Sequence, residues 1–99
     1  MLNISKTIED GKALFVLEGR LDIETSPEFE EDLRGSLDNI GELVIDFEKL
    51  DYISSAGLRV LLATQKIMCK QGAMKLINVN SDVMEILDIT GFSEILTIE

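Results

Sequence analysis

The spacing of apolar side chains changes along the chain, and these changes predict its elements. Between residues 2 and 8, apolar and polar side chains alternate with the period of a half-buried strand. Residues 9–12 include an Asp-Gly pair, which is typical of a tight hairpin turn. The continuous apolar run at residues 13–17 suits a more central strand, and we expect a loop at residues 19–22. The chain is therefore expected to open with an antiparallel hairpin.

The next segment has the three- and four-residue spacing of an amphipathic helix. Thr25 and Glu28 are placed as in a capping box, and Pro27 is tolerated in a first helical turn. Residues 39–41 resemble the end of this helix. The expected buried face consists of Phe29, Leu33, Ser36, Leu37 and Ile40.

The second half of the chain continues to alternate strands with helices. We expect a strand at residues 42–47, a helix at 56–70 ending at Gly72, a strand at 74–79, a helix capped by Ser81 and ended by Gly91, and a short strand at 95–98. The order β-β-α-β-α-β-α-β predicts an α/β fold with a mixed, mostly parallel sheet and right-handed crossovers. We expect the 99 residues to form a single domain, residues 1–99.

Composition narrows the classes of function. Nine basic and nineteen acidic residues give a net charge of −10, which argues against binding nucleic acid or an anionic membrane surface. A protein partner with a basic patch would be complementary, although the same charge can serve only solubility. No apolar run approaches the ~20 residues of a membrane span. We expect no signal peptide, and the single cysteine, Cys69, also favours a cytoplasmic protein.

Catalytic and cofactor motifs are missing from the sequence. The chain contains no histidine, which removes any Ser-His-Asp arrangement and most zinc sites. No glycine-rich loop of the P-loop or dinucleotide-binding type occurs. We therefore expect neither an enzyme nor a protein with a cofactor or metal of its own.

The most informative stretch is residues 46–62, where a buried strand leads into a helix. Two hydroxyls, Ser54 and Ser55, are followed by the small residues Ala56 and Gly57. Serine is a preferred helix N-cap, and a helix N-terminus favours an anion because of its free N–H groups and partial positive charge. We hypothesise that Ser55 stands at this helix start and gains and loses a phosphate.

Each candidate residue also has a plainer interpretation. Asp22 follows the second strand as Ser55 follows the third, so the two loops meet if those strands are parallel neighbours. Asp22 can instead be a local turn former, and either Ser54 or Ser55 can act only as a cap. Gly57 can serve packing, and Arg59 can face a partner or simply add solubility.

Four segments resemble the STAS domain family, and within it the bacterial anti-sigma factor antagonists. The signature lies at residues 50–62, LDYISSAGLRVLL. Residues 17–22 match the family's Gly-x-Leu-Asp turn, residues 74–79 match its strand after the second helix, and residues 83–92 match its closing helix. The four segments occur in the family's order, and the resemblance covers nearly the whole chain.

This resemblance implies a switch by exchange of partners. The unphosphorylated antagonist binds an anti-sigma factor that is also a serine kinase, which frees a sigma factor. The kinase then phosphorylates the signature serine, here Ser55, and a PP2C-type phosphatase resets the protein. Asp22 would be the acidic loop residue beside it. The implied partner-binding residues are Asp22, Ser54, Ser55, Ala56, Gly57 and Arg59.

Other functions are compatible with the same sequence. Antagonists of this kind usually carry Asp before the acceptor serine and Ser or Thr after it, whereas Ser54 and Ala56 stand here. An accessory or scaffold subunit of another assembly, such as a lipid-transport or signalling complex, is therefore an alternative. A small hydrolase using Ser55 would lack a base, and nucleotide binding would rest only on the helix N-terminus.

Overall fold

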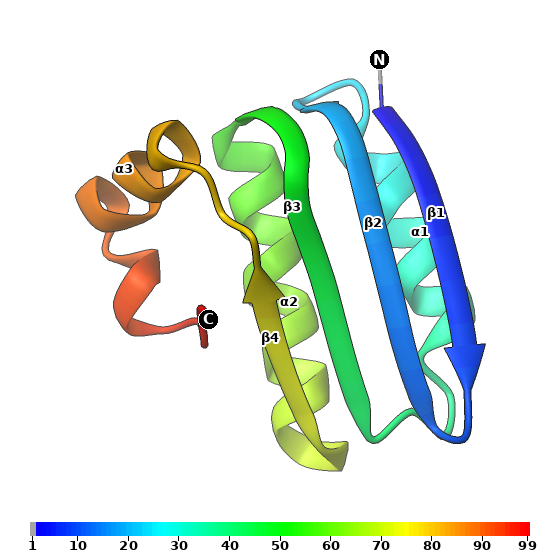
Figure 1. The fold of residues 1–99 in the computed structure, drawn as a ribbon. Coiled ribbons are helices and arrows are strands. Elements are labelled where there is room, and N and C mark those ends of the chain that lie inside the picture. Colours follow the sequence, from blue (N-terminus) through cyan, green and yellow to red (C-terminus); the bar gives the residue numbers. More distant parts are fainter. Residues whose placement is uncertain (1) are drawn as a thin grey trace.

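A four-stranded mixed sheet in the order β1-β2-β3-β4 forms the centre of the computed structural model, which describes residues 2–99 (Figure 1). The elements are β1 (Leu2–Glu9), β2 (Lys12–Leu21), α1 (Ser26–Ser36), β3 (Glu42–Ile53), α2 (Ser55–Gln71), β4 (Ala73–Ile77), α3 (Ser81–Thr90) and the short 3-10 helix η1 (Phe92–Glu94). This architecture confirms the expected mixed α/β fold.

The strand directions follow from the connections. β1 and β2 pair antiparallel through the predicted turn, where Asp10 and Gly11 have φ of 51° and 77°. A two-residue hairpin turn commonly requires such positive φ values. β2 pairs parallel with β3, and β3 pairs parallel with β4. Because β2 and β3 are parallel neighbours, the loops that follow them lie at the same edge of the sheet, as the sequence predicted.

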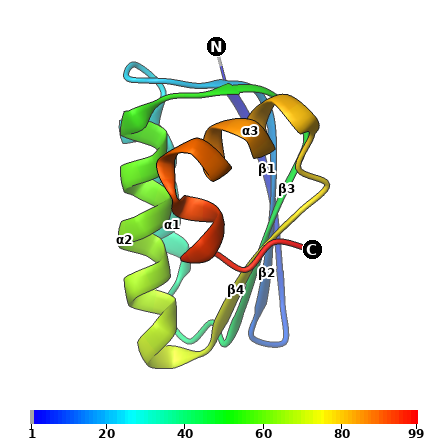
Figure 2. The same cartoon turned by 90° about the vertical axis from the view of Figure 1, so that its left-hand side faces the viewer.

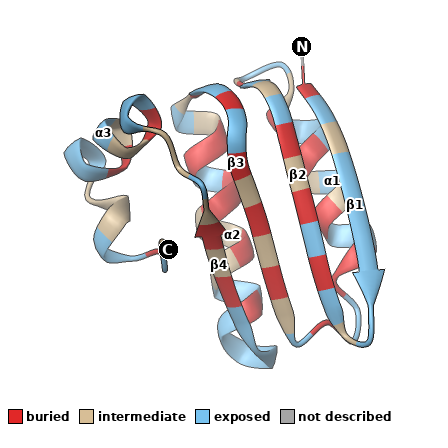
Figure 3. Cartoon of the chain, in the orientation of Figure 1, coloured by how far each residue is buried: buried red, intermediate tan, exposed pale blue. Residues whose placement is uncertain are grey.

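The hydrophobic core lies between the sheet and the helices α1 and α2, and Val83 and Leu87 of α3 complete it. Figure 2 shows α1 and α2 on one face of the sheet, whereas the opposite face carries no helix. Figure 3 shows buried positions alternating along β2 and β3. Phe15 and Phe29 meet edge to face, with their ring centroids 6.3 Å apart, and this contact joins β2 to α1. All five residues of the predicted helical face are buried, Phe29, Leu33 and Ser36 within α1 and Leu37 and Ile40 just beyond its end.

The strands β2 and β3 are longer than the sequence predicted. β2 reaches Leu21 rather than residue 17, and β3 reaches Ile53 rather than residue 47. Their pairing shifts register twice, between Val16 and Glu18 and again at Gly19, which has φ of 110°. Such bulges interrupt the regular alternation of buried side chains, so the sequence pattern does not show how far these strands extend. The predicted loop at residues 19–22 is therefore mostly strand.

Two predicted helix caps are wrong. Thr25 precedes α1 but makes no capping bond, because its hydroxyl donates to the carbonyl of Arg20 at 2.8 Å and accepts from the N–H of Asp22 at 2.9 Å. α3 is capped by Asn80 rather than Ser81. The Asn80 Oδ1 accepts from the N–H of Val83 at 2.9 Å.

The ends of the other elements also differ slightly from expectation. α1 ends at Ser36 rather than at residues 39–41, and β4 spans Ala73–Ile77 because Asn78 turns into the left-handed region with φ of 57°. The expected last strand is reduced to a single parallel bridge between Leu76 and Ile98, because the 3-10 turn of η1 occupies the preceding residues. Gly91 ends α3 with φ of 82°, as predicted.

Gly72 ends α2 as expected, and there is no room for a side chain at this position. A Cβ at this position would lie 1.9 Å from the carbonyl oxygen of Gly41, so the two backbones approach too closely for any side chain. The N–H of Ala73 donates to that same carbonyl at 3.0 Å. The glycine therefore lets β4 begin alongside β3 directly after the helix.

Candidate functional site

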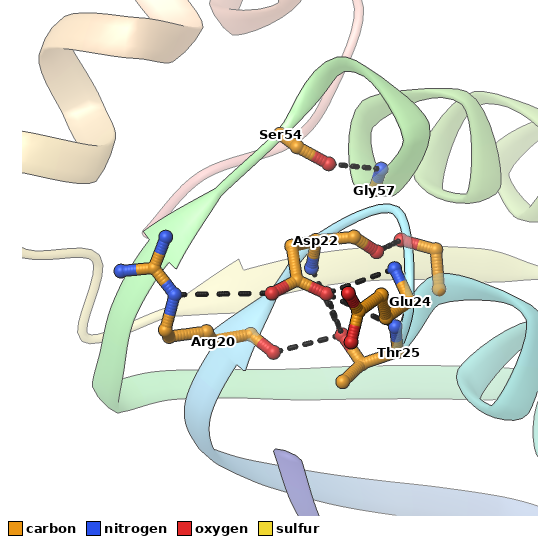
Figure 4. A network of polar contacts seen from close by, with 7 residues as sticks. Arg20, Asp22, Glu24, Thr25, Ser54 and Gly57 are labelled. Carbon is orange, nitrogen blue, oxygen red and sulfur yellow. Dashed lines mark hydrogen bonds and ion pairs between the residues drawn. The ribbon is translucent and has the colours of Figure 1, made fainter. Parts of the chain in front are cut away.

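The candidate site lies where β2 and β3 end side by side. Leu21 and Ile53 are opposite each other in the register, and the N–H of Ser54 donates a 2.9 Å hydrogen bond to the carbonyl of Leu21. This bond fixes the start of α2 against the β2–α1 loop. Figure 4 shows Ser54, Gly57 and the loop residue Asp22 together at this edge.

The two serines of the signature have different roles. Ser54 has the extended backbone of an N-cap, and its hydroxyl accepts a long, 3.4 Å hydrogen bond from the N–H of Gly57. Ser55 is the first residue of α2 and is exposed. Because Ser54 takes the capping role, the hydroxyl of Ser55 is not needed for it and stays exposed to solvent.

Gly57 and Ala56 are placed differently by the same turn. A Cβ on Gly57 would lie 2.8 Å from Cγ of Leu21 and 3.0 Å from Cγ1 of Ile53, and both neighbours are fully buried. Gly57 therefore supports the packing interpretation, since it lets α2 start close to the ends of the two strands. Ala56 is half-buried and faces a groove described below.

Asp22 organises its own loop. Its Oδ1 accepts hydrogen bonds from the N–H of Glu24 at 3.0 Å and from the N–H and hydroxyl of Thr25 at 3.1 and 3.2 Å. These bonds, chiefly the one from the Thr25 N–H, lower the pKa of Asp22 below the ordinary carboxyl value. The local-turn interpretation is thus correct, and the loop places a fixed negative charge at the edge of the sheet that carries Ser55 (Figure 4).

An Arg–Tyr pair beside Asp22 was not found from the sequence. The Nε of Arg20 lies 3.8 Å from Oδ2 of Asp22, and its Cζ stands 4.4 Å from the ring centroid of Tyr52. Arg20 and Tyr52 are opposite each other in the β2–β3 register after both bulges. The cation–π contact with Tyr52 and the ion pair with Asp22 together connect β3 to the Asp22 loop. The contact depends on the strand register, which the sequence does not show.

A shallow groove of about 350 Å³ runs between the starts of α1 and α2. It is lined by Ile23, Ser26, Pro27, Glu30, Ala56, Arg59 and Val60. Ile23 is 75% exposed although it is fully aliphatic, and Arg59 is also exposed. The groove adjoins Ser55, because Ala56 and Arg59 lie on the first turns of the helix that Ser55 begins. Its lining therefore combines apolar and charged side chains.

Within residues 2–99 no three His, Cys, Asp or Glu side chains gather as a metal site would require. In the same part of the chain no helix has the length and apolar character needed to cross a membrane. Cys69 is exposed near the end of α2, away from the Ser55 edge.

These features define a small α/β domain with an exposed hydroxyl at a helix start. The chain belongs to the STAS domain family, whose family model matches residues 3–99. This confirms the family resemblance noted in the sequence.

Two curated relatives and one solved structure show how close the similarity is. BtrV of Bordetella bronchiseptica, a candidate anti-sigma factor antagonist, is 36% identical over 92 residues, which are 90% of this chain and 78% of BtrV. The anti-sigma-B factor antagonist of Bacillus subtilis is 32% identical over 81% of this chain and 74% of its own. An anti-sigma factor antagonist from Mycobacterium paratuberculosis has the same fold, with a TM-score of 0.89 at 21% identity over 99% of this chain and 85% of its own.

Proposed function

We propose that this protein is an anti-sigma factor antagonist that works by exchange of partners. In its unphosphorylated form it binds an anti-sigma factor that is also a serine kinase, and this binding releases a sigma factor. Phosphorylation of Ser55 ends the interaction, and a PP2C-type phosphatase restores it. All of these steps take place in the cytoplasm. The function is regulatory rather than enzymatic, in keeping with the names of both curated relatives.

The observation that carries the proposal is that Ser54 caps the helix whereas Ser55 does not. The hydroxyl of Ser54 accepts a hydrogen bond from a helix N–H, whereas Ser55 is exposed and makes no capping bond. A phosphate on Ser55 would therefore change the surface without removing the helix cap. The first turn of α2 would remain in place, so the modification would act on the partner and leave the fold intact.

The negative charges near Ser55 favour a large loss of partner affinity when Ser55 is phosphorylated. A phosphoserine adds about −1.5 to −2 charge, here on a chain that already carries −10 and beside the ionised Asp22. The helix N-terminus offsets only about 0.3–1 kcal/mol of the unfavourable energy at an exposed position. A partner that covers this edge would meet added bulk and repulsion. Each loss of about 1.4 kcal/mol weakens binding tenfold.

The chemistry requires no group from this chain except the hydroxyl. The Ser55 Oγ would bond to the γ-phosphorus of ATP, the bond from that phosphorus to the β,γ-bridging oxygen would break, and ADP would leave. The hydroxyl proton would pass to a base of the kinase. The kinase would also hold the nucleotide and its metal, which fits a chain without histidine.

In vitro phosphorylation would test this proposal. The protein is incubated with ATP and the anti-sigma factor kinase from the same cell, and the modified residue is mapped by mass spectrometry. We expect one phosphate on Ser55, none on a Ser55→Ala variant, and continued modification of a Ser54→Ala variant. Modification of Ser54 alone, or no modification while the kinase phosphorylates another protein, would contradict the proposal and favour the scaffold alternative.

A further inference from the structure

Arg59 is an unpaired cation on an acidic protein. The chain has three arginines. Arg20 lies 3.8 Å from a carboxylate oxygen of Asp22, and Arg34 lies 3.6 Å from one of Glu30. Within residues 2–99 no carboxylate oxygen lies within 4 Å of the Arg59 guanidinium, and its side chain makes no hydrogen bond. The guanidinium is therefore available to an anion from outside.

The helix geometry places Arg59 beside the proposed phosphate. Ser55 and Arg59 are four residues apart on α2, and both are exposed. Side chains with this spacing share one helix face, with their Cβ atoms about 5–6 Å apart. An acidic group four residues before a basic one is the favourable order for such a pair, because both then agree with the helix dipole.

The groove places the same guanidinium at the proposed partner surface. Arg59 lines the groove with the apolar side chains of Ile23, Pro27 and Val60. The groove's other charged residue, Glu30, is paired with Arg34. The groove therefore combines an apolar surface with the unpaired guanidinium of Arg59. It is complementary to a partner segment that presents an apolar side chain next to a carboxylate.

We propose that Arg59 couples the phosphate to partner choice. In the unphosphorylated protein Arg59 pairs with a carboxylate of the anti-sigma factor that docks over the groove. When Ser55 carries a phosphate, the guanidinium turns back along the helix to the phosphate oxygens and is withdrawn from the partner. The switch then removes an attractive contact in addition to adding repulsion. This inference rests on the proposed function for the identity of the partner.

The phosphate half of the inference can be tested without any kinase. Phosphoserine is incorporated at position 55 during translation, and its second ionisation is followed by 31P NMR as the pH is changed. A guanidinium stabilises the dianion, so Arg59→Gln should raise that pKa by about 0.2–0.7 unit. Lys70→Gln, which removes an exposed positive charge near the other end of the same helix, is the control, and it should leave the pKa unchanged. Equal values for the parent protein and Arg59→Gln would overturn the capture of Arg59.

The partner half is tested by binding of the unphosphorylated variants to the anti-sigma factor kinase. Arg59→Gln should weaken binding about three- to tenfold and reduce its sensitivity to salt, whereas Arg59→Lys should recover most of the affinity. Unchanged affinity in Arg59→Gln would overturn this half. If the kinase does not phosphorylate Ser55 in the parent protein, the proposed function fails, whereas the NMR result still decides the phosphate contact.

Discussion

The carbonyl of Leu21 accepts a 2.9 Å hydrogen bond from the N–H of Ser54, directly beyond the last paired residues of two parallel strands. This bond joins the loop that carries Asp22 to the helix that begins at Ser55. It explains why two residues more than thirty positions apart in the sequence contribute to one edge of the molecule.

Gly57 should be intolerant of even a methyl group. In Gly57→Ala the new Cβ would lie 2.8 Å from the buried Cγ of Leu21. Overpacking of this kind costs about 1–3 kcal/mol, which exceeds the gain of up to about 1 kcal/mol from better helix propensity. We expect a net loss of about 1 kcal/mol, measured by urea unfolding. Gly35→Ala is the control, because a Cβ there meets nothing within 4 Å, and it should be neutral or stabilising.

Asn80 should matter more than its neighbour Ser81. The Asn80 side chain caps α3 and also donates to the carbonyl of Leu50 at 2.8 Å, so it connects the helix to β3. We expect Asn80→Ala to lower the free energy of unfolding by about 1–2 kcal/mol. Ser81→Ala removes an exposed hydroxyl and should change it by less than about 0.5 kcal/mol. A larger effect of Ser81→Ala would contradict the cap assignment.

Asp22 should make the fold sensitive to acid. Its loop hydrogen bonds lower the pKa of Asp22 in the folded protein below the ordinary value of 3.8. The unfolded chain therefore binds this proton at a higher pH than the folded chain does. The contribution to stability is complete above about pH 3.8 and is lost as the pH falls through the lower folded value.

The Asp22→Asn variant isolates this contribution. Its side-chain oxygen can still accept the N–H bonds of Glu24 and Thr25, but it does not titrate. The difference in unfolding midpoint between the two proteins should be larger at pH 6 than at pH 3. A constant difference across that range would show that the charge of Asp22 does not stabilise its loop.

Removal of the hydroxyl should affect stability differently at the two serines. Ser54→Ala deletes the N-cap and should cost about 0.5–1 kcal/mol, towards the low end because the bond is 3.4 Å long. Ser55→Ala replaces an exposed residue with a better helix former and should leave stability unchanged or slightly higher. Thermal unfolding of both variants measures the difference. Loss of stability in Ser55→Ala alone would mean that Ser55 is the cap.

The sequence predicted the fold wherever the core keeps a simple period. Burial alternates regularly along residues 13–17 and 42–47, and both segments form central strands as expected. Beyond them the buried positions shift to Leu50 and Ile53 in β3, at steps of three, because bulges change the pairing. Nothing in the local sequence pattern shows such a shift, so the pattern predicts ends for β2 and β3 that are too early.

The candidate site was predictable to the same degree. Ser55 and Asp22 could be found because parallel strands bring their following loops to one edge. The Arg20–Tyr52 pair could not, since it depends on the register after two bulges. The exposure of Ile23 could not be predicted either, because it depends on how the Asp22 loop bends. A polar Thr25 in helix-capping position was misleading for the same reason: its hydroxyl is used by that loop.

The most direct test of the account is the affinity of the anti-sigma factor kinase for protein carrying phosphoserine at position 55, measured by calorimetry against the unmodified protein. We expect binding to weaken at least tenfold. Phosphoserine at position 5 is the control, because Ser5 is exposed in the middle of the edge strand β1 and away from the helix starts, and it should leave the affinity nearly unchanged. Equal affinity with and without the phosphate on Ser55, or an equal loss from either position, would contradict the account.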